Sequence, residues 1–293
     1  MSKKHLITAA ASDPRALLPL LGARLGVSET EARRAVSEGS VWIDGRRAGP
    51  SVHTVSAGQK VTVFLAEKQP PLPRPQVVYE DRDLLVVNKP AGLLCQPGRR
   101  GGPSLLTLLP GPLWLPHRLD GETSGLTMLA RSAEVCARLG QALVEGRIER
   151  CYLARVVGTP ALSGRIDLRI GKAAGQGAPK MRTYPVTASS GDSAVSHFWR
   201  RDTLSLHSGS QSLVLVRLET GRTHQVRVHL AALGHPILGD TVYGGPPNDR
   251  LLLHATELDL VHPRTGKKLL LAADLPSGFW PPPLPDWTES AAR

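Results

Sequence analysis

The sequence predicts an α+β protein with two domains, and three observations support this prediction. The chain has 293 residues, which is long for a single core. Residues 67–76 contain four prolines, which favour a stiff extended linker. Beyond them, short strand-like runs are mixed with separated helical patterns. We therefore expect a disordered start at 1–13, a small domain at 14–66, a large domain at 77–285 and a tail at 286–293.

The chain carries a strong positive charge. Lys and Arg number 36 against 25 for Asp and Glu, which gives a formal net charge of +11. A basic surface of this size favours a polyanionic partner, because neutralised phosphates release counterions. The alternative is a generally basic, arginine-rich proteome. Aromatic residues make up only 4% of the chain, which argues against a protein that stacks many bases along one strand.

Cysteine usage and hydropathy indicate the compartment. Cys95, Cys136 and Cys151 form an odd set without Cys-x-x-Cys spacing, which argues against a disulfide framework and a structural zinc site. No run approaches the roughly 20 apolar residues that a membrane span needs. We therefore expect a soluble, cytoplasmic protein. We also expect the protein to be a monomer.

The small domain begins with two helical patterns. Leucines recur every four residues over 17–25, as on one helix face, although Pro19 interrupts this pattern. Ser28 and Glu31 have the spacing of a capping box, which predicts that a second helix begins there. Gly39 fits the end of this helix.

Two strands follow, at residues 41–43 and 60–65, and Asp44-Gly45 is a strong turn signal between them. Two short helices followed by a hairpin-like unit resemble the S4 RNA-binding domain. In that family the second helix and the following turn carry basic residues toward RNA. The resemblance implies RNA binding by the four residues at these places: Arg33, Arg34, Arg46 and Arg47. The alternative is an ordinary solvated helix face.

The large domain reads as short strands with a few helices. Strand patterns occur at residues 77–79, 84–87, 151–157 and 213–218. Helical patterns occur at 133–143 and 225–233. Residues 171–179 are rich in Gly, Ala and Lys, which predicts a mobile loop.

A candidate reactive carboxylate ends the run His117-Arg118-Leu119-Asp120. A lone Arg-x-Asp is more often a surface ion pair than a catalytic site. Here residues 121–125 predict a tight, hydroxyl-rich turn, and the apolar run at 126–130 predicts a buried strand directly after it. Reactive groups on loops that rigid elements brace are typical of active sites.

A second basic block places two arginines and two histidines between Arg222 and His229. His224 and His229 are five residues apart, which is not the spacing of a zinc pair on one helix face. No acidic ligand or cysteine accompanies them, so we expect no metal site. An anion site, or an arginine partner for a buried carboxylate, fits this block better.

The combination of these blocks resembles a known family. The runs 117–125 and 220–230 are similar to signatures of the RluA family of pseudouridine synthases. Residues 88–93, 234–240 and 252–255 resemble further blocks of that family. The resemblance covers residues 77–285, and an S4-like segment often precedes this domain in relatives. It implies a mixed, largely antiparallel curved sheet flanked by helices, with a central cleft.

The resemblance also implies roles for individual residues. Asp120 matches the essential aspartate of the family, and Tyr152 matches the tyrosine that lies against the uracil. Arg222 matches the basic residue that pairs with the aspartate. Arg118 matches the residue that fills the space left by the extruded nucleotide, and Thr223 is expected to contact the substrate.

The implied reaction converts uridine to pseudouridine in structured RNA. The base must be flipped out, detached from the ribose at N1 and reattached through C5. An aspartate can act as nucleophile or stabilise a cationic sugar, and an arginine keeps it ionised. No metal, redox cofactor or ATP is required. We expect 23S ribosomal RNA as the substrate, with transfer RNA as the nearest alternative.

Two other functions fit the same residues. One is a non-catalytic RNA-binding or ribosome-assembly factor on the same scaffold. The other is an RNA glycosidase that stops after the base is detached. The chain departs from the family pattern at Leu94-Cys95-Gln96 and at Gly121, which bears on the choice of substrate more than on the chemistry.

Overall fold

The computed structural model describes residues 2–49, 54–66, 74–98, 101–173, 181–207 and 209–281. The chain divides into two compact units, residues 1–71 and 72–293, and the boundary falls inside the proline-rich stretch. Most of that stretch, residues 67–73, lies outside the described residues. Among the described residues, no helix combines the length and apolar character needed to cross a membrane.

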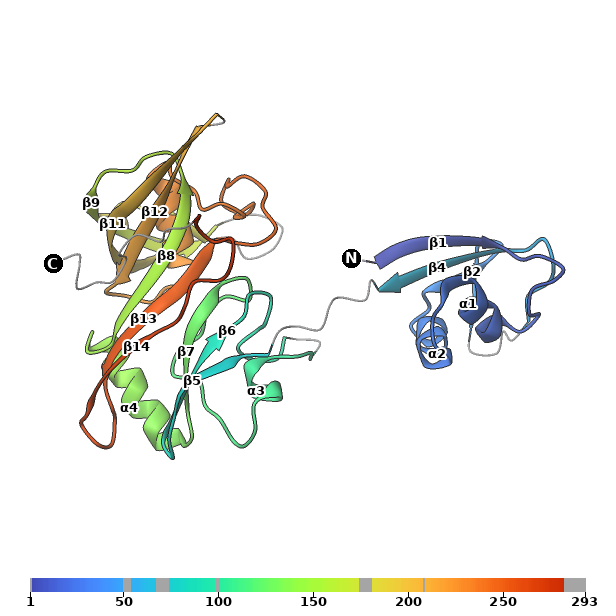
Figure 1. Ribbon diagram of the computed structural model, residues 1–293, viewed down its shortest axis with the longest axis horizontal. Helices are drawn as coiled ribbons and strands as arrows, with labels where there is room; N and C mark the ends of the chain where they lie inside the picture. Colours follow the sequence, from blue (N-terminus) through green and yellow to red (C-terminus); the bar gives the residue numbers. More distant parts are fainter. Residues whose placement is uncertain are drawn as a thin grey trace. The chain divides into compact units, whose positions relative to one another are not determined.

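The first unit is a four-stranded antiparallel sheet with two helices on one face (Figure 1). Its strands, in the spatial order β1-β4-β2-β3, are Ser2–Thr8, Lys60–Ala66, Val41–Ile43 and Arg46–Arg47. Its helices are α1 (Leu17–Leu25) and α2 (Glu29–Ser37). Leu20, Leu21 and Val36 pack from the helices against Val41 and Val63 of the sheet, so one apolar layer holds the unit together.

The expected disorder of residues 1–13 is wrong for the described residues 2–8. They form β1, which pairs with β4 along its whole length, from Ser2 opposite Ala66 to Thr8 opposite Lys60. Ile7 is 7% exposed and joins the core, whereas Leu6, on the opposite face, is 65% exposed. The strand forms because β4 supplies its hydrogen-bond partners, which are 52 or more residues away in the sequence.

Local signals in the first unit are confirmed. Pro19 lies in the first turn of α1, where a missing N–H costs no helical hydrogen bond. Ser28 and Glu31 form both hydrogen bonds of the capping box at the start of α2. Asp44 and Gly45 both have positive φ, 47° and 77°, as the tight turn between β2 and β3 requires.

The second unit is built on one ten-stranded sheet. Its strands are β5 (Gln76–Glu80), β6 (Leu84–Lys89), β7 (Ser124–Ala130), β8 (Glu149–Val157), β9 (Ser163–Lys172), β10 (Met181–Tyr184), β11 (Asp192–Leu206), β12 (Gly209–Leu218), β13 (Leu253–Val261) and β14 (Lys268–Ala272). The spatial order is β10-β9-β11-β12-β8-β13-β7-β6-β5, with β14 paired to β13. Only β7 and β13 pair in parallel among the described strands, so the sheet is mixed and largely antiparallel, as expected.

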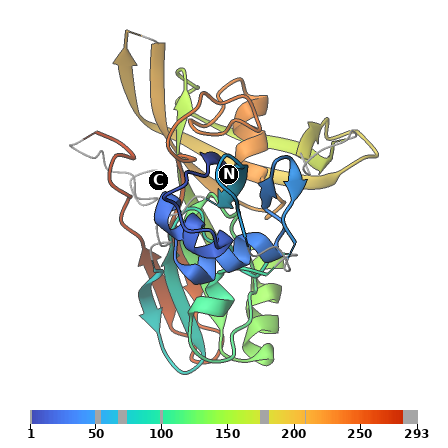
Figure 2. The ribbon, with the colours of Figure 1, turned by 90° about the vertical axis from the view of Figure 1, so that its right-hand side faces the viewer.

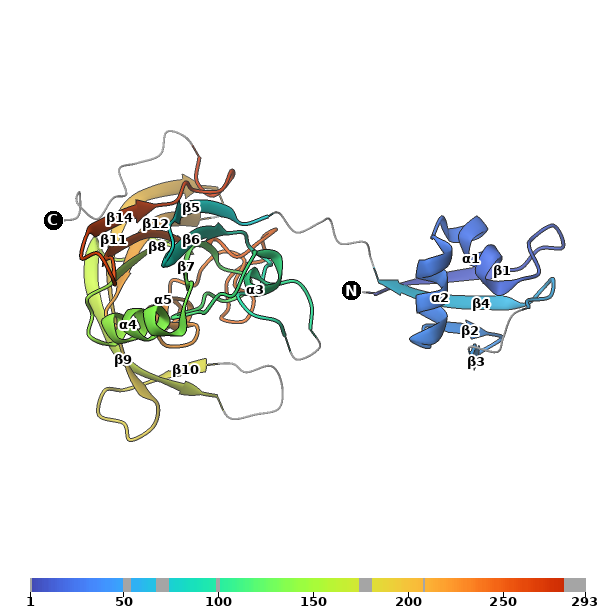
Figure 3. The same ribbon diagram turned by 90° about the horizontal axis from the view of Figure 1, so that it is seen from below.

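Figures 2 and 3 show how this sheet is shaped. The hairpin of β11 and β12 extends beyond the neighbouring strands (Figure 2). Seen from below, β9 and β10 lie at one end of the sheet, and β5 and β14 lie toward the other (Figure 3). Part of the predicted loop at 171–179 belongs to β9, which ends at Lys172, and residues 174–180 lie outside the described residues.

Helices cover both faces of the sheet. Leu84 and Val86 of β6 pack in one apolar cluster, whereas Leu85 and Val87 pack in another, because alternate side chains of a strand point to opposite faces. The first cluster includes residues of α4 (Ala133–Val144), and the second includes residues of α5 (Gln225–Ala232). Both helices match the sequence prediction within one residue. A short third helix, α3 (Leu105–Leu108), packs on the α5 side.

Gly125 is the point where β7 meets β13. It lies opposite Ala255 in the parallel pair and has φ +112°, which side chains disfavour. A Cβ atom there would lie 2.5 Å from the Ala255 amide nitrogen and closer still to the Ala255 carbonyl oxygen. The glycine therefore allows the backbone after the Asp120 turn to lie directly against β13.

We expect Gly125→Ala to destabilise the second unit by about 2 kcal/mol or more, because the positive φ and the backbone overlap both oppose it. Gly140→Ala in α4 is the matched control. A Cβ at Gly140 meets nothing within 4 Å, and helix propensity favours alanine by about 1 kcal/mol. Urea denaturation measures both changes. Equal midpoints for the two variants would contradict this account of Gly125.

Candidate active site

The two basic sequence blocks meet in a cleft of about 480 Å³ in the second unit. Its walls come from the loop before β7, the end of α4, the start of β8 and the segment between β12 and α5. The predicted site residues of this unit all line it: Arg118, Asp120, Tyr152, Arg222 and Thr223. The fold thus brings together residues that are about a hundred positions apart in the chain.

Cys95 and Lys89 hold the backbone of the turn that carries Asp120. Cys95 contributes its sulfur, which accepts the Leu119 N–H at 3.3 Å and lies 3.4 Å from the Leu119 carbonyl oxygen. Lys89, fully buried, donates to the carbonyl oxygens of Gly121 at 3.1 Å and Leu93 at 2.7 Å. Burial lowers the pKa of Lys89 to about 8. The side chain of Asp120 itself is 28% exposed, so substrate can reach it.

Arg227 is the arginine closest to Asp120 among the described ion pairs. Its Nη1 lies 3.6 Å from Asp120 Oδ2. The same guanidinium makes two hydrogen bonds to the fully buried Asp240, at 2.7 and 2.8 Å. Burial opposes its charge, but the bonds and the charges of Asp240 and Asp120 raise the pKa of Arg227. The buried guanidinium therefore places a permanent positive charge beside the Asp120 carboxylate.

The prediction that Arg222 pairs with Asp120 does not match this geometry. Arg222 is exposed, and its Nε donates to the Ser193 carbonyl oxygen at 3.0 Å. Arg222 precedes α5, whereas Arg227 falls in the first turn of this helix, is 3% exposed and lines the cleft beside Asp120. Sequence spacing identified the block but not which arginine faces the aspartate.

Two groups complete the surroundings of Asp120: His224, which the sequence singled out only as a rejected metal ligand, and Tyr243, which it did not single out. His224 Nε2 lies 3.7 Å from Asp120 Oδ2, and His224 Nδ1 lies 2.8 Å from the hydroxyl of Tyr243. Asp240 and Tyr243 belong to a turn in the segment between α5 and β13, within or next to a block that resembles the family. That block was the available signal, but nothing local in it indicated contact with residue 120.

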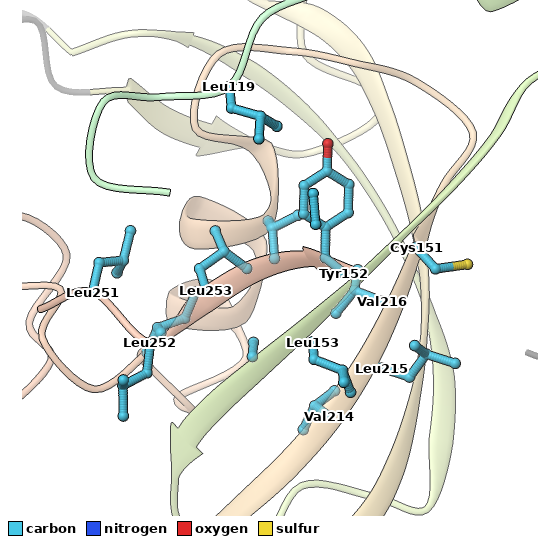
Figure 4. Close-up of a cluster of buried hydrophobic side chains, with 14 of the residues drawn as sticks. Leu119, Cys151, Tyr152, Leu153, Val214, Leu215, Val216, Leu251, Leu252 and Leu253 are labelled. Carbon is cyan, nitrogen blue, oxygen red and sulfur yellow. The ribbon is translucent and has the colours of Figure 1, made fainter. Parts of the chain in front are cut away.

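Tyr152 forms one wall of the cleft. It lies on β8, is 7% exposed and packs in the apolar core of this face. Figure 4 shows its ring rising from β8 with the hydroxyl oxygen toward the segment that carries Leu119. Burial raises the pKa of Tyr152, so the phenol stays protonated at neutral pH. A flat, neutral ring at this place suits contact with a planar base.

The other residues of the two basic blocks either face solvent at the cleft or support the fold. Arg118 and Thr223 are exposed at the cleft, where they can meet a substrate. His117 instead accepts the Met128 N–H through Nε2 at 2.9 Å, and burial lowers its pKa to about 3. His117 therefore stays neutral and braces β7.

The four arginines predicted to bind RNA lie on the first unit. Arg33 and Arg34 project from α2 and form ion pairs with Glu29 and Glu38, each at 2.7 Å. Arg47 donates to the Gly39 carbonyl oxygen at 2.7 Å. Arg46 is exposed on β3. The structure thus places all four on α2 and the adjoining hairpin, the two places where the sequence predicted them.

A further group of potential metal ligands lies outside the cleft, at Asp81, Asp83 and His262. These side chains form ion pairs within the protein. Asp83 pairs with Arg264 at 2.8 Å. His262 Nδ1 accepts the N–H groups of Arg264 and Thr265, so Nε2 carries the proton and faces Asp81 at 2.9 Å. The geometry is that of a hydrogen-bonded corner at the turn between β5 and β6.

Comparisons with known proteins agree with this site. Residues 83–232 match the family of RNA pseudouridylate synthases. Ribosomal large subunit pseudouridine synthase D of Yersinia pestis is 32% identical over 281 residues, which cover 85% of this chain and 83% of that protein. The protein of the same name from Pseudomonas aeruginosa is 36% identical over 230 residues, or 70% and 69% of the two chains.

Two solved structures agree with this fold. Human RNA pseudouridylate synthase domain containing 1 has a TM-score of 0.60 and 27% identity, over 71% of this chain and 86% of that one. Human RNA pseudouridylate synthase domain containing 4 has a TM-score of 0.57 and 26% identity, over 70% and 90%. The sequence motifs, the cleft and these comparisons lead to one conclusion: the chain belongs to the RNA pseudouridylate synthases, in the RluA family.

Proposed function

We propose that this enzyme converts uridine to pseudouridine in large-subunit ribosomal RNA, with Asp120 as its catalytic carboxylate. The observation that carries the proposal is the position of Asp120 beside the buried Arg227, in a cleft that Tyr152 also lines. The names of the bacterial relatives support ribosomal RNA as the substrate. Such a substrate also fits a cytoplasmic enzyme.

The geometry suits the two bond changes of the reaction. The bond between N1 and C1′ breaks, and C1′ then bonds to C5 of the same base, which must stay in place between the steps. C5 finally loses its hydrogen as a proton, and N1 gains a proton. Tyr152 offers a flat wall that can hold the detached ring. Attack on the sugar and stabilisation of a cationic sugar both use the negative charge of Asp120, and the positive charge of Arg227 lies 3.6 Å from it.

The first unit supports a role as an S4-like RNA-binding domain. Helix α2 carries Arg33 and Arg34, and the tight hairpin that follows carries Arg46 and Arg47. Phosphate contacts from such a patch add affinity that depends on salt but not on base sequence. We infer that this domain supplies RNA affinity, while the cleft selects and converts the uridine.

The first test replaces the carboxylate. We expect Asp120→Asn to lower the rate of tritium release from 5-tritiated uridine in large-subunit ribosomal RNA by at least about 100-fold, because the amide cannot act as nucleophile or base. RNA affinity should stay within a few-fold. Asp259→Asn is the control and should keep full activity. Asp259 lies on β13 and forms an ion pair with Lys268 of β14.

The outcomes separate the alternatives. Isomerisation that survives Asp120→Asn would exclude Asp120 as the catalytic residue. Full rescue of a deletion strain by Asp120→Asn would favour the RNA-binding or assembly function. Release of free uracil would indicate a glycosidase. A pseudouridine map of the deletion strain should lose a site in 23S ribosomal RNA, whereas loss in transfer RNA alone would contradict the proposed substrate.

A second test compares the two arginines. We expect Arg227→Gln to lower kcat by about 100-fold or more, because it removes the charge beside Asp120, whereas Arg222→Gln should act mainly on KM. Removing one partner of a buried pair also costs about 3–5 kcal/mol of stability. The double variant Arg227→Met with Asp240→Leu removes both charges, so it should fold and still lack activity. If only Arg222→Gln loses activity, the predicted pairing of Arg222 with Asp120 is correct and the role given to Arg227 is wrong.

A third test concerns the first unit. We expect Arg46→Gln with Arg47→Gln to weaken RNA binding and to reduce the slope of log Kd against log salt by about 0.7–0.9 per lost phosphate contact. Arg24→Gln is the control, because its guanidinium is already engaged by Asp13 at 2.8 Å. Binding measured by filter retention between low and physiological salt gives both slopes. An unchanged slope in the double variant would exclude this patch as the RNA contact.

A further inference from the structure

A continuous chain of polar contacts connects β10 to Asp120. The Met181 N–H donates to the Tyr243 hydroxyl oxygen at 3.0 Å. The hydroxyl lies 2.8 Å from His224 Nδ1, with the two rings nearly perpendicular. The other ring nitrogen, Nε2, lies 3.7 Å from Asp120 Oδ2. Met181, Tyr243 and His224 thus form one series of contacts that ends at Asp120 Oδ2.

The protons of this chain can be assigned from its two ends. The Asp120 carboxylate can only accept, which favours a proton on the nitrogen that faces it, Nε2. The Tyr243 oxygen already accepts the Met181 N–H, which favours donation of the phenolic proton to Nδ1. Both ends thus select the same imidazole tautomer. Burial lowers the pKa of His224 and raises that of Tyr243, which is consistent with a neutral imidazole and a protonated phenol.

The backbone of His224 is held in an unusual conformation. Its φ is 57°, and Asp44 in a hairpin turn is the only other non-glycine residue with positive φ in the described part of the chain. His224 is the N-terminal flanking residue of α5, so this conformation fixes where the helix starts. It directs the imidazole toward Asp120 while Arg227 approaches from the first turn. Strained backbone of this kind persists where the surroundings impose it, often at active sites.

Tyr243 supports both donors that approach Asp120. Its hydroxyl bonds His224, and its ring lies under the Arg227 guanidinium at 5.3 Å. Its N–H also donates to Asp240, which holds Arg227 from the other side. One tyrosine therefore fixes the direction of the imidazole and the position of the arginine.

We propose that His224 and Tyr243 are positioning residues that act together: Tyr243 fixes the tautomer of His224, and His224 then directs its Nε2 proton at the same oxygen of Asp120 that faces Arg227. The second carboxylate oxygen is thereby turned to the substrate. This inference rests on the proposed catalytic role of Asp120. Separations of 3.6 and 3.7 Å exceed hydrogen bonds, but such contacts often shorten when substrate binds.

The proposal predicts a separation of kcat from RNA affinity. Tyr243→Phe keeps the ring under Arg227 and removes only the hydroxyl. We expect the single-turnover rate to fall about tenfold, the loss that corresponds to one hydrogen bond, while Kd for the RNA stays within twofold. Tyr184→Phe is the matched control. Tyr184 also lies beneath an arginine, Arg182, and its hydroxyl bonds a backbone carbonyl, but it lies outside the cleft lining.

A pair of His224 variants tests the direction of the Nε2 proton. His224→Gln can place an amide N–H near the position of Nε2, whereas His224→Asn can accept from Tyr243 but ends short of Asp120. We expect His224→Asn to lose at least tenfold in rate and His224→Gln to recover most of that loss. A purely structural role would instead lower the melting temperature and affect both variants alike, so thermal unfolding is measured for each.

Asp120→Asn, assayed in parallel, separates two kinds of failure. If Asp120→Asn is inactive while Tyr243→Phe and His224→Asn keep the wild-type single-turnover rate, the positioning role is wrong and the proposed function stands. If Asp120→Asn is active, the proposed function itself fails. If Tyr243→Phe changes Kd and not the rate, these residues bind RNA and do not position the carboxylate.

Discussion

The buried pair between Arg227 and Asp240 is the interaction on which the active site depends. Asp240 is fully buried and Arg227 is 3% exposed, so both charges have left water at considerable cost. Two parallel hydrogen bonds offset much of this cost and fix the guanidinium in one orientation. The same pair anchors the first turn of α5 to the turn before β13. The charge beside Asp120 is therefore set by packing rather than by a mobile surface side chain.

The opposite side of the Asp120 turn is fixed by backbone contacts. The parallel pairing of β7 with β13 begins at Ser124 and Gly125, directly after the turn. Lys89 gathers three carbonyl oxygens around its buried ammonium group, and one of them belongs to Gly121 within the turn. Backbone contacts thus hold the turn that carries Asp120, and the charged Arg227 lies beside its carboxylate. An active site that must hold a detached base through two bond changes benefits from such rigidity, because misplacement by about 1 Å can cost a large part of the rate.

The sequence predicted what short-range patterns determine. Patterns among residues close together in the sequence predicted the capping box at Ser28 and the tight turn at Asp44. Such patterns also predicted helices α4 and α5. The Asp120 turn and the position of Tyr152 on a strand were predictable for the same reason. Strand β1 was not, because it exists through its pairing with β4, and Arg227 was not distinguished from Arg222. That distinction depends on the left-handed backbone at His224, which no local pattern indicates.

The net charge alone does not show which arginines are free to contact RNA. Many arginines that produce the net charge of +11 are already engaged with carboxylates, including Arg24, Arg33, Arg34, Arg227 and Arg264. Exposed pairs on a helix exchange partners at little cost, since each is worth at most about 1 kcal/mol, so Arg33 and Arg34 can turn to phosphates. Arg227 cannot, because its partner is buried with it. The charge that we propose attracts RNA and the charge that we propose acts beside Asp120 therefore belong to different arginines, and exposure distinguishes them where composition does not.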